Sequence, residues 1–112
     1  MVKIAIIGAG SIAFTRKLIA DILAVPELQD TFFHCMDINP TNLDNMFQLA
    51  ERDIRENAVE TAARIEKTLD RREALTDADY VINLVRVGGL EGLQYDIEIP
   101  LKYGVDQCVG DT

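Results

Sequence analysis

Residues 2–14, with the sequence VKIAIIGAGSIAF, decide the fold of this chain. The apolar run Val2–Ile7 predicts a buried strand, and the residues after it predict a glycine turn that opens a helix. Gly8, Gly10 and Ala13 have the spacing of the dinucleotide-binding pattern G-x-G-x-x-G/A. In that pattern the first residue permits a tight turn, the second lets a pyrophosphate approach the backbone, and the third lets the helix pack closely on the strand. The free N–H groups of the helix N-terminus would then face the phosphates.

A glycine-rich turn also joins strands to helices in proteins that bind no nucleotide, so the pattern alone leaves both interpretations open. Asp37 favours nucleotide binding, because it directly follows a second, mostly apolar strand predicted over Thr31–Met36. An acid at this place accepts hydrogen bonds from both hydroxyls of the adenosine ribose and repels a 2′-phosphate, which favours NAD over NADP. The alternative is that Asp37 only caps the helix that follows it.

Apolar residues at helical spacing predict two long helices in the first half of the chain. The first ends before Pro26, and the second begins at Pro40 with Asn39 as a suitable N-cap. The apolar positions of the first helix are Phe14, Leu18, Ile19, Ile22 and Leu23. Those of the second helix are Leu43, Met46, Phe47, Ala50 and Ile54.

The second half of the chain continues the alternation of strands and helices. Two strands and two helices are predicted, over Ala63–Thr68, Asp79–Val85, Asp70–Asp77 and Leu90–Tyr103. In the short helix Ala74 and Leu75 should face inward. Pro100 should kink or restart the last helix, and Gly104 should terminate it. One face of that last helix carries Leu93, Ile97 and Leu101.

The order of these elements predicts an α/β fold, with a Rossmann-like, doubly wound parallel sheet in the strand order 3-2-1-4. This arrangement is the first half of such a sheet. Because no fifth strand is predicted before Thr112, we expect residues 1–112 to form an incomplete N-terminal NAD-binding domain, truncated before a catalytic part.

The composition restricts the partners and the location of the protein. A net charge of −8 and a pI of about 4.5 argue against nucleic acid and against anionic membrane surfaces as partners. No apolar run reaches the roughly 18 residues of a spanning helix, and no signal-peptide cleavage site follows the apolar start. Two cysteines without a C-x-x-C motif agree with a reducing compartment, so we expect a cytoplasmic protein.

The sequence contains no complete metal site and no pair of nucleophile and base. His34 and Cys35 are adjacent on a predicted strand, so their side chains should point to opposite faces and cannot bind one metal together. Cys35 is expected to be a small buried apolar residue. Cys108 has no histidine near it in the sequence and is not expected to be a ligand or a nucleophile.

The turn after the last predicted strand is a second candidate for ligand contact. In a doubly wound sheet, ligands lie outside the carboxyl ends of the strands, so this turn should face the same crevice as the first glycine turn. We expect Asn83 and Val87 to contact the cofactor and Arg86 to bind a phosphate or a carboxylate. On its position alone, Arg86 is equally consistent with a solvated loop charge.

Several blocks of the chain, in the right order, resemble glycoside hydrolase family 4. These blocks are Ile6–Ser11, Met36–Asn39, Arg86–Gly92, Ile99–Val105 and Gly110–Thr112. Within the family, the ending Val105–Thr112 resembles the α-galacturonidase and α-galactosidase branch, and Arg71–Leu75 resembles the α-galacturonidase members.

This resemblance implies a glycosidase whose mechanism departs from the usual pair of carboxylates. Members of the family oxidise the sugar at carbon 3 with tightly bound NAD⁺, after which a tyrosine base removes the proton on carbon 2. A divalent metal, usually Mn²⁺, stabilises the enediolate; the glycosidic group is eliminated, water adds and the hydride returns. The implied cofactors are therefore NAD and manganese, the implied partner is a sugar, and a homo-oligomer (dimer or tetramer) is the implied assembly.

The resemblance also assigns roles to single residues. Its pyrophosphate turn matches Gly8, Gly10, Ser11 and Ile12. Asp37 matches the ribose acid, and Arg86 matches an arginine that binds the sugar 6-phosphate in phospho-specific relatives; in a galacturonidase it would meet the uronate carboxylate. Asp111 aligns with an acid near the catalytic tyrosine, which implies a supporting role. The family's metal-binding cysteine and histidine and its tyrosine base lie beyond Thr112, and Cys108 does not match that cysteine.

Two other functions stay open on the sequence. An ordinary NAD-dependent dehydrogenase of the malate or lactate type would share the glycine turn and Asp37, but not the blocks at Arg86–Gly89 and Ile99–Gly104. A nucleotide-binding module without catalysis, such as a redox sensor, is the second alternative.

Overall fold

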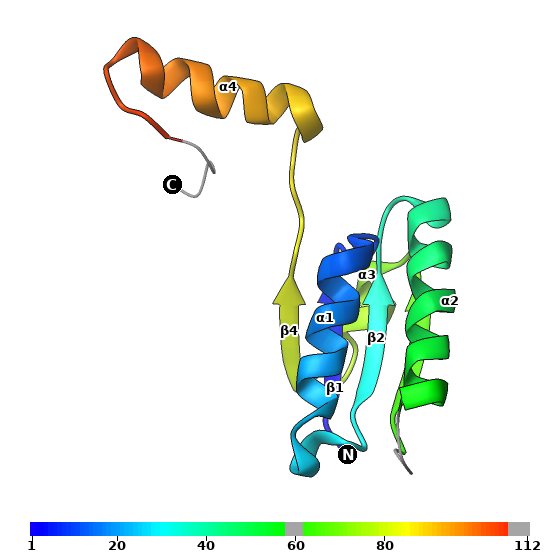
Figure 1. The fold of residues 1–112 in the computed structure, drawn as a ribbon. Coiled ribbons are helices and arrows are strands. Elements are labelled where there is room, and N and C mark those ends of the chain that lie inside the picture. The colour runs from blue at the N-terminus through cyan, green and yellow to red at the C-terminus, as the bar shows by residue number, and fades with distance from the viewer. Residues whose placement is uncertain (58–61, 108–112) are drawn as a thin grey trace.

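The structure, a computed structural model, describes residues 1–57 and 62–107 as four strands alternating with helices (Figure 1). The strands are β1 (Lys3–Ile7), β2 (Phe32–Met36), β3 (Arg64–Thr68) and β4 (Tyr80–Asn83). The α-helices are α1 (Ile12–Leu23), α2 (Pro40–Asn57), α3 (Arg71–Leu75) and α4 (Gly89–Lys102), and a 3₁₀ turn, η1, spans Pro26–Leu28. None of the helices in this part of the chain combines the length and apolarity needed to cross a bilayer.

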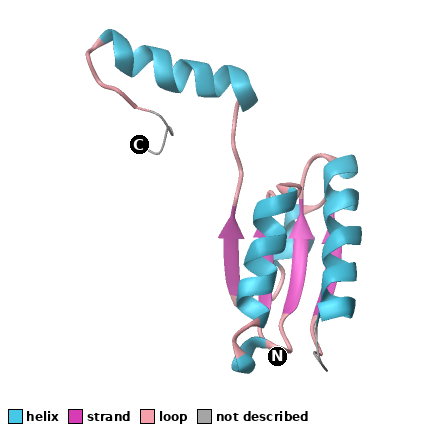
Figure 2. Cartoon of the chain, viewed as in Figure 1, coloured by secondary structure: helices cyan, strands magenta, loops and turns pink. Residues whose placement is uncertain are grey.

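The four strands form one parallel sheet in the order β3-β2-β1-β4, which confirms the predicted fold class and strand order (Figure 2). At its carboxyl edge, Ile7 of β1 lies between Met36 of β2 and Asn83 of β4. Because the strands are parallel, the segments that follow β1, β2 and β4 all start at this same edge of the sheet.

The main core lies between the sheet and the helices α1 and α2. Its buried members are Ile4, Ile6, Ala9, Ile19, Phe33, Cys35, Leu43, Met46 and Ala50. The apolar stripe predicted for α2 is confirmed, because it supplies three of these residues and packs Phe47 and Ile54 against them. On the opposite face, α3 covers a smaller cluster of Ala5, Met36 and Ala74.

An ion pair fixes α1 beside α2. The guanidinium of Arg16 donates to both carboxylate oxygens of Asp53, at 2.6 and 3.0 Å. This contact raises the pKa of Arg16 and lowers the pKa of Asp53. Both side chains are about one-third exposed, so solvent screening limits what the pair adds to stability.

In α1 the predicted positions Ile19, Ile22 and Leu23 pack in or against the core, but Phe14 does not. Phe14 is 55% exposed, whereas Thr15 is fully buried, so placing Phe14 in the core was wrong. Ala13 is also exposed, and close packing at the start of this helix depends instead on Ala9 and Thr15. The helix begins at Ile12, and a spacing of three to four residues from there brings Thr15, not Phe14, to the side facing the sheet.

Two elements in the second half are shorter than predicted. β4 ends at Asn83 rather than at Val85, although the Leu84 N–H still donates to the carbonyl of Ile7 at 2.8 Å. α3 ends at Leu75, and this residue is 40% exposed rather than inward-facing.

The last helix lies within one residue of its predicted bounds. Pro100 does not restart α4, since a single helix runs from Gly89 to Lys102 with the proline in its last turn. Gly104 has φ +76° and ends the helix as predicted. The apolar face through Leu93, Ile97 and Leu101 forms, but α4 has no buried residue and stands away from the sheet (Figure 1).

Candidate functional site

The glycine turn after β1 is held at the point where three strands end. The N–H groups of Gly8 and Ala9 both donate to the carbonyl of Met36 at the end of β2, at 2.8 and 2.9 Å. Gly8 has φ +89°, and a Cβ there would lie 2.9 Å from the backbone carbon of Leu84, just after β4. Gly8 is therefore required both for its backbone conformation and for space.

Gly10 is required for space alone, because its φ lies outside the left-handed region. Its N–H donates to Oδ2 of Asp37 at 2.8 Å, and an added Cβ would lie 2.7 Å from that oxygen and 3.1 Å from Cβ of Asn42. The sequence pattern explained this glycine by the approach of a pyrophosphate. The structure adds that the carboxylate of Asp37 already approaches it closely.

Asp37 does not serve as the cap of α2. Its second oxygen, Oδ1, accepts a hydrogen bond from the Asn39 N–H at 2.9 Å. The capping role belongs to Asn39, as predicted, since its side-chain oxygen accepts from the Asn42 N–H at 3.0 Å. One carboxylate oxygen of Asp37 is thus bonded to an amide of the glycine turn, and the other to the Asn39 amide at the start of α2.

The N-terminus of α1 is open to an anion. Ser11 at the N-cap makes no side-chain capping bond, and no acid lies in the first turn of the helix. The N–H groups that begin a helix have no acceptor within the helix, and together with the helix dipole they favour a negatively charged group; the Ser11 N–H donates to the Gly8 carbonyl at 3.4 Å. Ser11 and Ile12, both predicted to contact a pyrophosphate, lie at this end, beside Gly10 and Asp37.

Thr15 stabilises the glycine turn through a hydrogen bond, and the sequence did not predict this role. The Thr15 hydroxyl donates to the carbonyl of Ala9 at 3.0 Å inside the core. A buried hydroxyl with this bond fixes the middle of the turn to the first turn of α1. The only sequence signal was a small polar residue between two predicted apolar positions, which is too common to be informative.

Of the residues after β4, only the first two lie against the glycine turn. The backbone at Leu84 and Val85 lies against Gly8, and the Asn83 side chain accepts a long 3.4 Å bond from the Val85 N–H. Arg86 is exposed, and Val87 is 90% exposed on the segment that leads out to α4. Within the described residues, neither contacts the glycine turn through a hydrogen bond or an ion pair.

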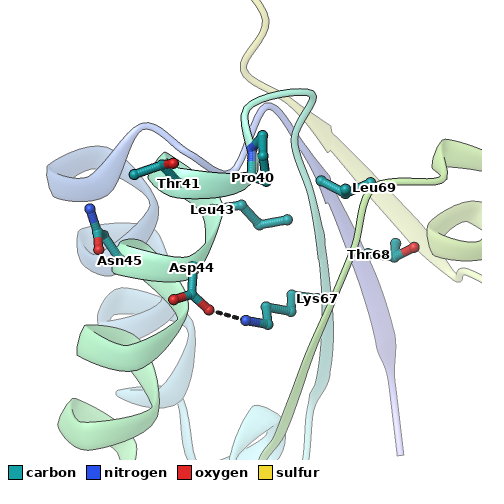
Figure 3. Close-up of a pocket in the computed structure, with 8 residues that line it drawn as sticks. All are labelled: Pro40, Thr41, Leu43, Asp44, Asn45, Lys67, Thr68 and Leu69. Carbon is teal, nitrogen blue, oxygen red and sulfur yellow. Dashed lines mark hydrogen bonds and ion pairs between the residues drawn. The ribbon is translucent and has the colours of Figure 1, made fainter.

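A separate open cavity of about 560 Å³ lies at the same edge of the sheet, between the first turns of α2 and the end of β3 (Figure 3). An ion pair between Asp44 and Lys67 crosses it, with Pro40, Leu43 and Leu69 around the pair. None of the predicted site residues lines this cavity, so it is distinct from the glycine turn.

His34 and Cys35 are both buried and do not form a reactive site together. Burial raises the pKa of the Cys35 thiol to about 12, which keeps it protonated and unreactive. Burial is also the main cause that lowers the pKa of His34, and neither ring nitrogen has a hydrogen-bond partner among the described residues. No metal-binding group of three or more His, Cys, Asp or Glu occurs in residues 1–57 and 62–107. Asp111 and Cys108 lie outside the described residues.

Comparison with known proteins bears directly on this site. The model of the family described as "Family 4 glycosyl hydrolase" matches residues 3–112. An α-galactosidase of Rhizobium meliloti (strain 1021) is 56% identical over 110 residues, which are 98% of this chain and 22% of the relative. An α-galacturonidase of Bacillus subtilis (strain 168) is 30% identical over 113 residues, with 99% and 24% covered.

A solved structure has the same fold. The 6-phospho-β-glucosidase of Thermotoga maritima, determined with manganese, NAD⁺ and glucose 6-phosphate, superimposes with a TM-score of 0.78 at 29% identity. The match covers 95% of this chain and 24% of that one. The chain thus spans about a quarter of the length of the relatives that it matches.

Proposed function

The chain belongs to family 4 of the glycosyl hydrolases, and from this membership we propose that it forms the NAD-binding part of a glycosidase acting on α-galactosides or α-galacturonides. The 56% identity to an α-galactosidase, against 30% to an α-galacturonidase, supports the galactoside as the first substrate to test. The proposal concerns the whole protein, because the chain spans only part of its relatives' length.

The glycine turn carries the proposal for NAD. Gly8 and Gly10 let the turn lie close to the backbone after β4 and to the carboxylate of Asp37, and Ser11 at the N-terminus of α1 makes no side-chain capping bond. We assign the pyrophosphate to the turn and to the amides at Ser11 and Ile12. An ionised carboxylate has about four acceptor positions, so the two backbone amides on Asp37 leave about two for the ribose hydroxyls.

The chemistry that NAD supplies in this proposal is reversible hydride transfer at carbon 3 of the sugar, so that hydrolysis consumes no cofactor. This chain's residues bind and orient; none of those described is a general base in the scheme. Asn83 and Val87 are assigned to the cofactor and Asp111 to a supporting catalytic role. Arg86 is assigned to the carboxylate of an α-galacturonide, an anionic group that an α-galactoside lacks. Manganese is assigned to ligands beyond residue 112.

Binding of NAD⁺ to the chain tests the first part. Calorimetric titration with NAD⁺ and with NADP⁺ should give binding of NAD⁺ and much weaker binding of NADP⁺. Equal affinity for the two would contradict the role of Asp37 at the ribose.

Turnover by the protein at the full length of its relatives tests the second part. Aryl α-galactosides and aryl α-galacturonides should be hydrolysed when NAD⁺ and Mn²⁺ are present, and the activity should disappear with a chelator. Hydrolysis that persists without NAD⁺ and metal would contradict the proposal. Net production of NADH would instead favour an ordinary dehydrogenase.

The same proposal includes a cytoplasmic location and a homo-oligomeric assembly. Two cysteines without a C-x-x-C motif agree with a reducing compartment. Light scattering on the full-length protein would test the assembly, with a monomer as the contradicting result.

A further inference from the structure

The contact between Gly10 and Asp37 joins the two halves of the candidate site directly. The two residues lie 27 positions apart in the chain, yet the Gly10 N–H donates to Oδ2 of Asp37 at 2.8 Å in a half-buried place. The other oxygen is held by the Asn39 N–H at 2.9 Å, and Asn39 begins α2 through its bond to the Asn42 N–H. The chain of bonds therefore runs from the glycine turn, through one carboxylate, into the first turn of α2.

The absence of a side chain at Gly10 is explained by this carboxylate. The backbone conformation of Gly10 is one that alanine adopts without strain, because its φ is not in the left-handed region. The obstacle to alanine is steric: a Cβ would lie 2.7 Å from Oδ2 and 2.9 Å from Cγ of Asp37, with the Cβ of Asn42 as a weaker contact at 3.1 Å. Such distances require the acid to move away and to lose its bond to the amide.

We propose that Asp37 is a positioning residue for the phosphate-binding turn, in addition to its place at the ribose. Its carboxylate holds the Gly10 amide and thereby fixes the turn against the start of α2, and Gly10 is a glycine because this carboxylate needs the space. The consequence for NAD rests on the proposed function, whereas the contact itself does not. Removal of Asp37 then disturbs the turn that receives the phosphates as well as the ribose contact.

A double-mutant cycle in denaturant unfolding of the chain tests the coupling. Gly10→Ala should destabilise the chain with Asp37 present, and in an Asp37→Ala background the same substitution should cost about tenfold less in the unfolding equilibrium constant. Asp21→Ala is the matched control, because it removes an exposed acid of α1 far from the turn and should leave the cost of Gly10→Ala unchanged. If Gly10→Ala costs the same, within about twofold, with and without the Asp37→Ala substitution, the proposal is overturned.

Amide hydrogen exchange gives a second test that does not depend on Gly10→Ala folding. Asp37→Asn keeps an acceptor oxygen and should leave exchange of the Gly10 amide nearly unchanged, whereas Asp37→Ala should accelerate it by about tenfold or more. Unchanged exchange at Gly10 in the Asp37→Ala variant would also overturn the proposal.

Titration with NAD⁺ separates this inference from the function on which its consequence rests. If the protein at the full length of its relatives fails to bind NAD⁺ while the coupling is found, the proposed function fails and the positioning role stands. If NAD⁺ binds and no coupling is found, the positioning role fails alone.

Discussion

Two regions of this chain each contain a helix with an apolar face, but the surroundings of the two helices differ greatly. The turn region, made of β1, α1, β2 and the glycine turn between β1 and α1, includes fully buried Ile6, Ala9 and Phe33. The arm, residues 85–105, contains α4 without one buried residue, and Leu90 in it is 84% exposed. The amphipathic pattern was sufficient to predict a helix in both regions, but it predicts packing only where the chain also supplies the opposite surface.

The largest expected difference between the two regions is in the response to a glycine substitution. Gly8→Ala combines a left-handed backbone with a 2.9 Å contact to the Leu84 backbone and should lower the free energy of unfolding by about 3 kcal/mol. Gly104→Ala in the arm has φ +76° and no atom within 4 Å, so it should cost only about 1 kcal/mol. Urea unfolding of both variants measures this, and equal losses would show that contact with β4 adds nothing.

The next largest effect is on cofactor binding, and it tests whether the turn region holds NAD⁺. Asp37→Ala should weaken NAD⁺ binding by about tenfold to hundredfold, because the ribose loses a charged acceptor and the turn loses its support. The discrimination against NADP⁺ should narrow at the same time, since the repelling charge is gone. Calorimetry on the variant and on Asp21→Ala as control measures both, and an unaltered NAD⁺ affinity would remove Asp37 from the site.

A substitution in the arm should change the activity of the enzyme but not the stability of the fold. Arg86 is exposed and makes no hydrogen bond or ion pair with the described residues, so Arg86→Ala should change the free energy of unfolding by less than about 0.5 kcal/mol. In the full-length protein it should raise the Michaelis constant for an anionic substrate by about tenfold. Steady-state kinetics decide this, and an unchanged constant would contradict a substrate role for Arg86.

The smallest expected effect is a pH dependence confined to the turn region. His34 is 5% exposed and stacks on Phe32, and burial lowers its pKa, with Lys3 acting in the same direction and Glu66 and Glu73 opposing. The folded state therefore disfavours protonation. Stability is full above the unfolded-state pKa of about 6.5 and falls with decreasing pH, by at most about 1.4 kcal/mol per unit, until the folded-state pKa is passed.

His34→Phe isolates this contribution. Thermal unfolding between pH 5 and pH 8 should lose part of its pH dependence in the variant, because no group remains to be protonated at that position. A pH dependence identical to that of the unmodified chain would assign the effect to other groups.

The sequence was sufficient to predict the sheet, because apolar runs define parallel strands buried on both faces and the alternation of elements limits the topology. Ile6 and Phe33 lie where such runs place them. It was sufficient to predict that Ile19, Ile22 and Leu23 of α1 face the core, but not that Thr15 rather than Phe14 is buried in the first turn of this helix. The buried Thr15 hydroxyl donates to the Ala9 carbonyl, and the residue pattern does not contain that bond.

The site followed the same division. Gly8 and Asp37 could be predicted because each has a distinct chemical requirement, for a positive φ and for an acid at a strand end. The bond from Gly10 to Asp37 could not, because it depends on the separation in space of two segments that the sequence places 27 residues apart. For Arg86 the pattern indicated the correct edge of the sheet but not its distance from the turn.

The buried, protonated thiol of Cys35, in β2, can be used to measure how often the sheet opens to solvent. A thiol with a pKa of about 12 and no exposed surface reacts with an alkylating reagent only during the moments when the strand opens to solvent. The rate of labelling at Cys35, read from its peptide, therefore reports how often the turn region opens. NAD⁺ that binds at the neighbouring turn should slow that rate in proportion to its occupancy.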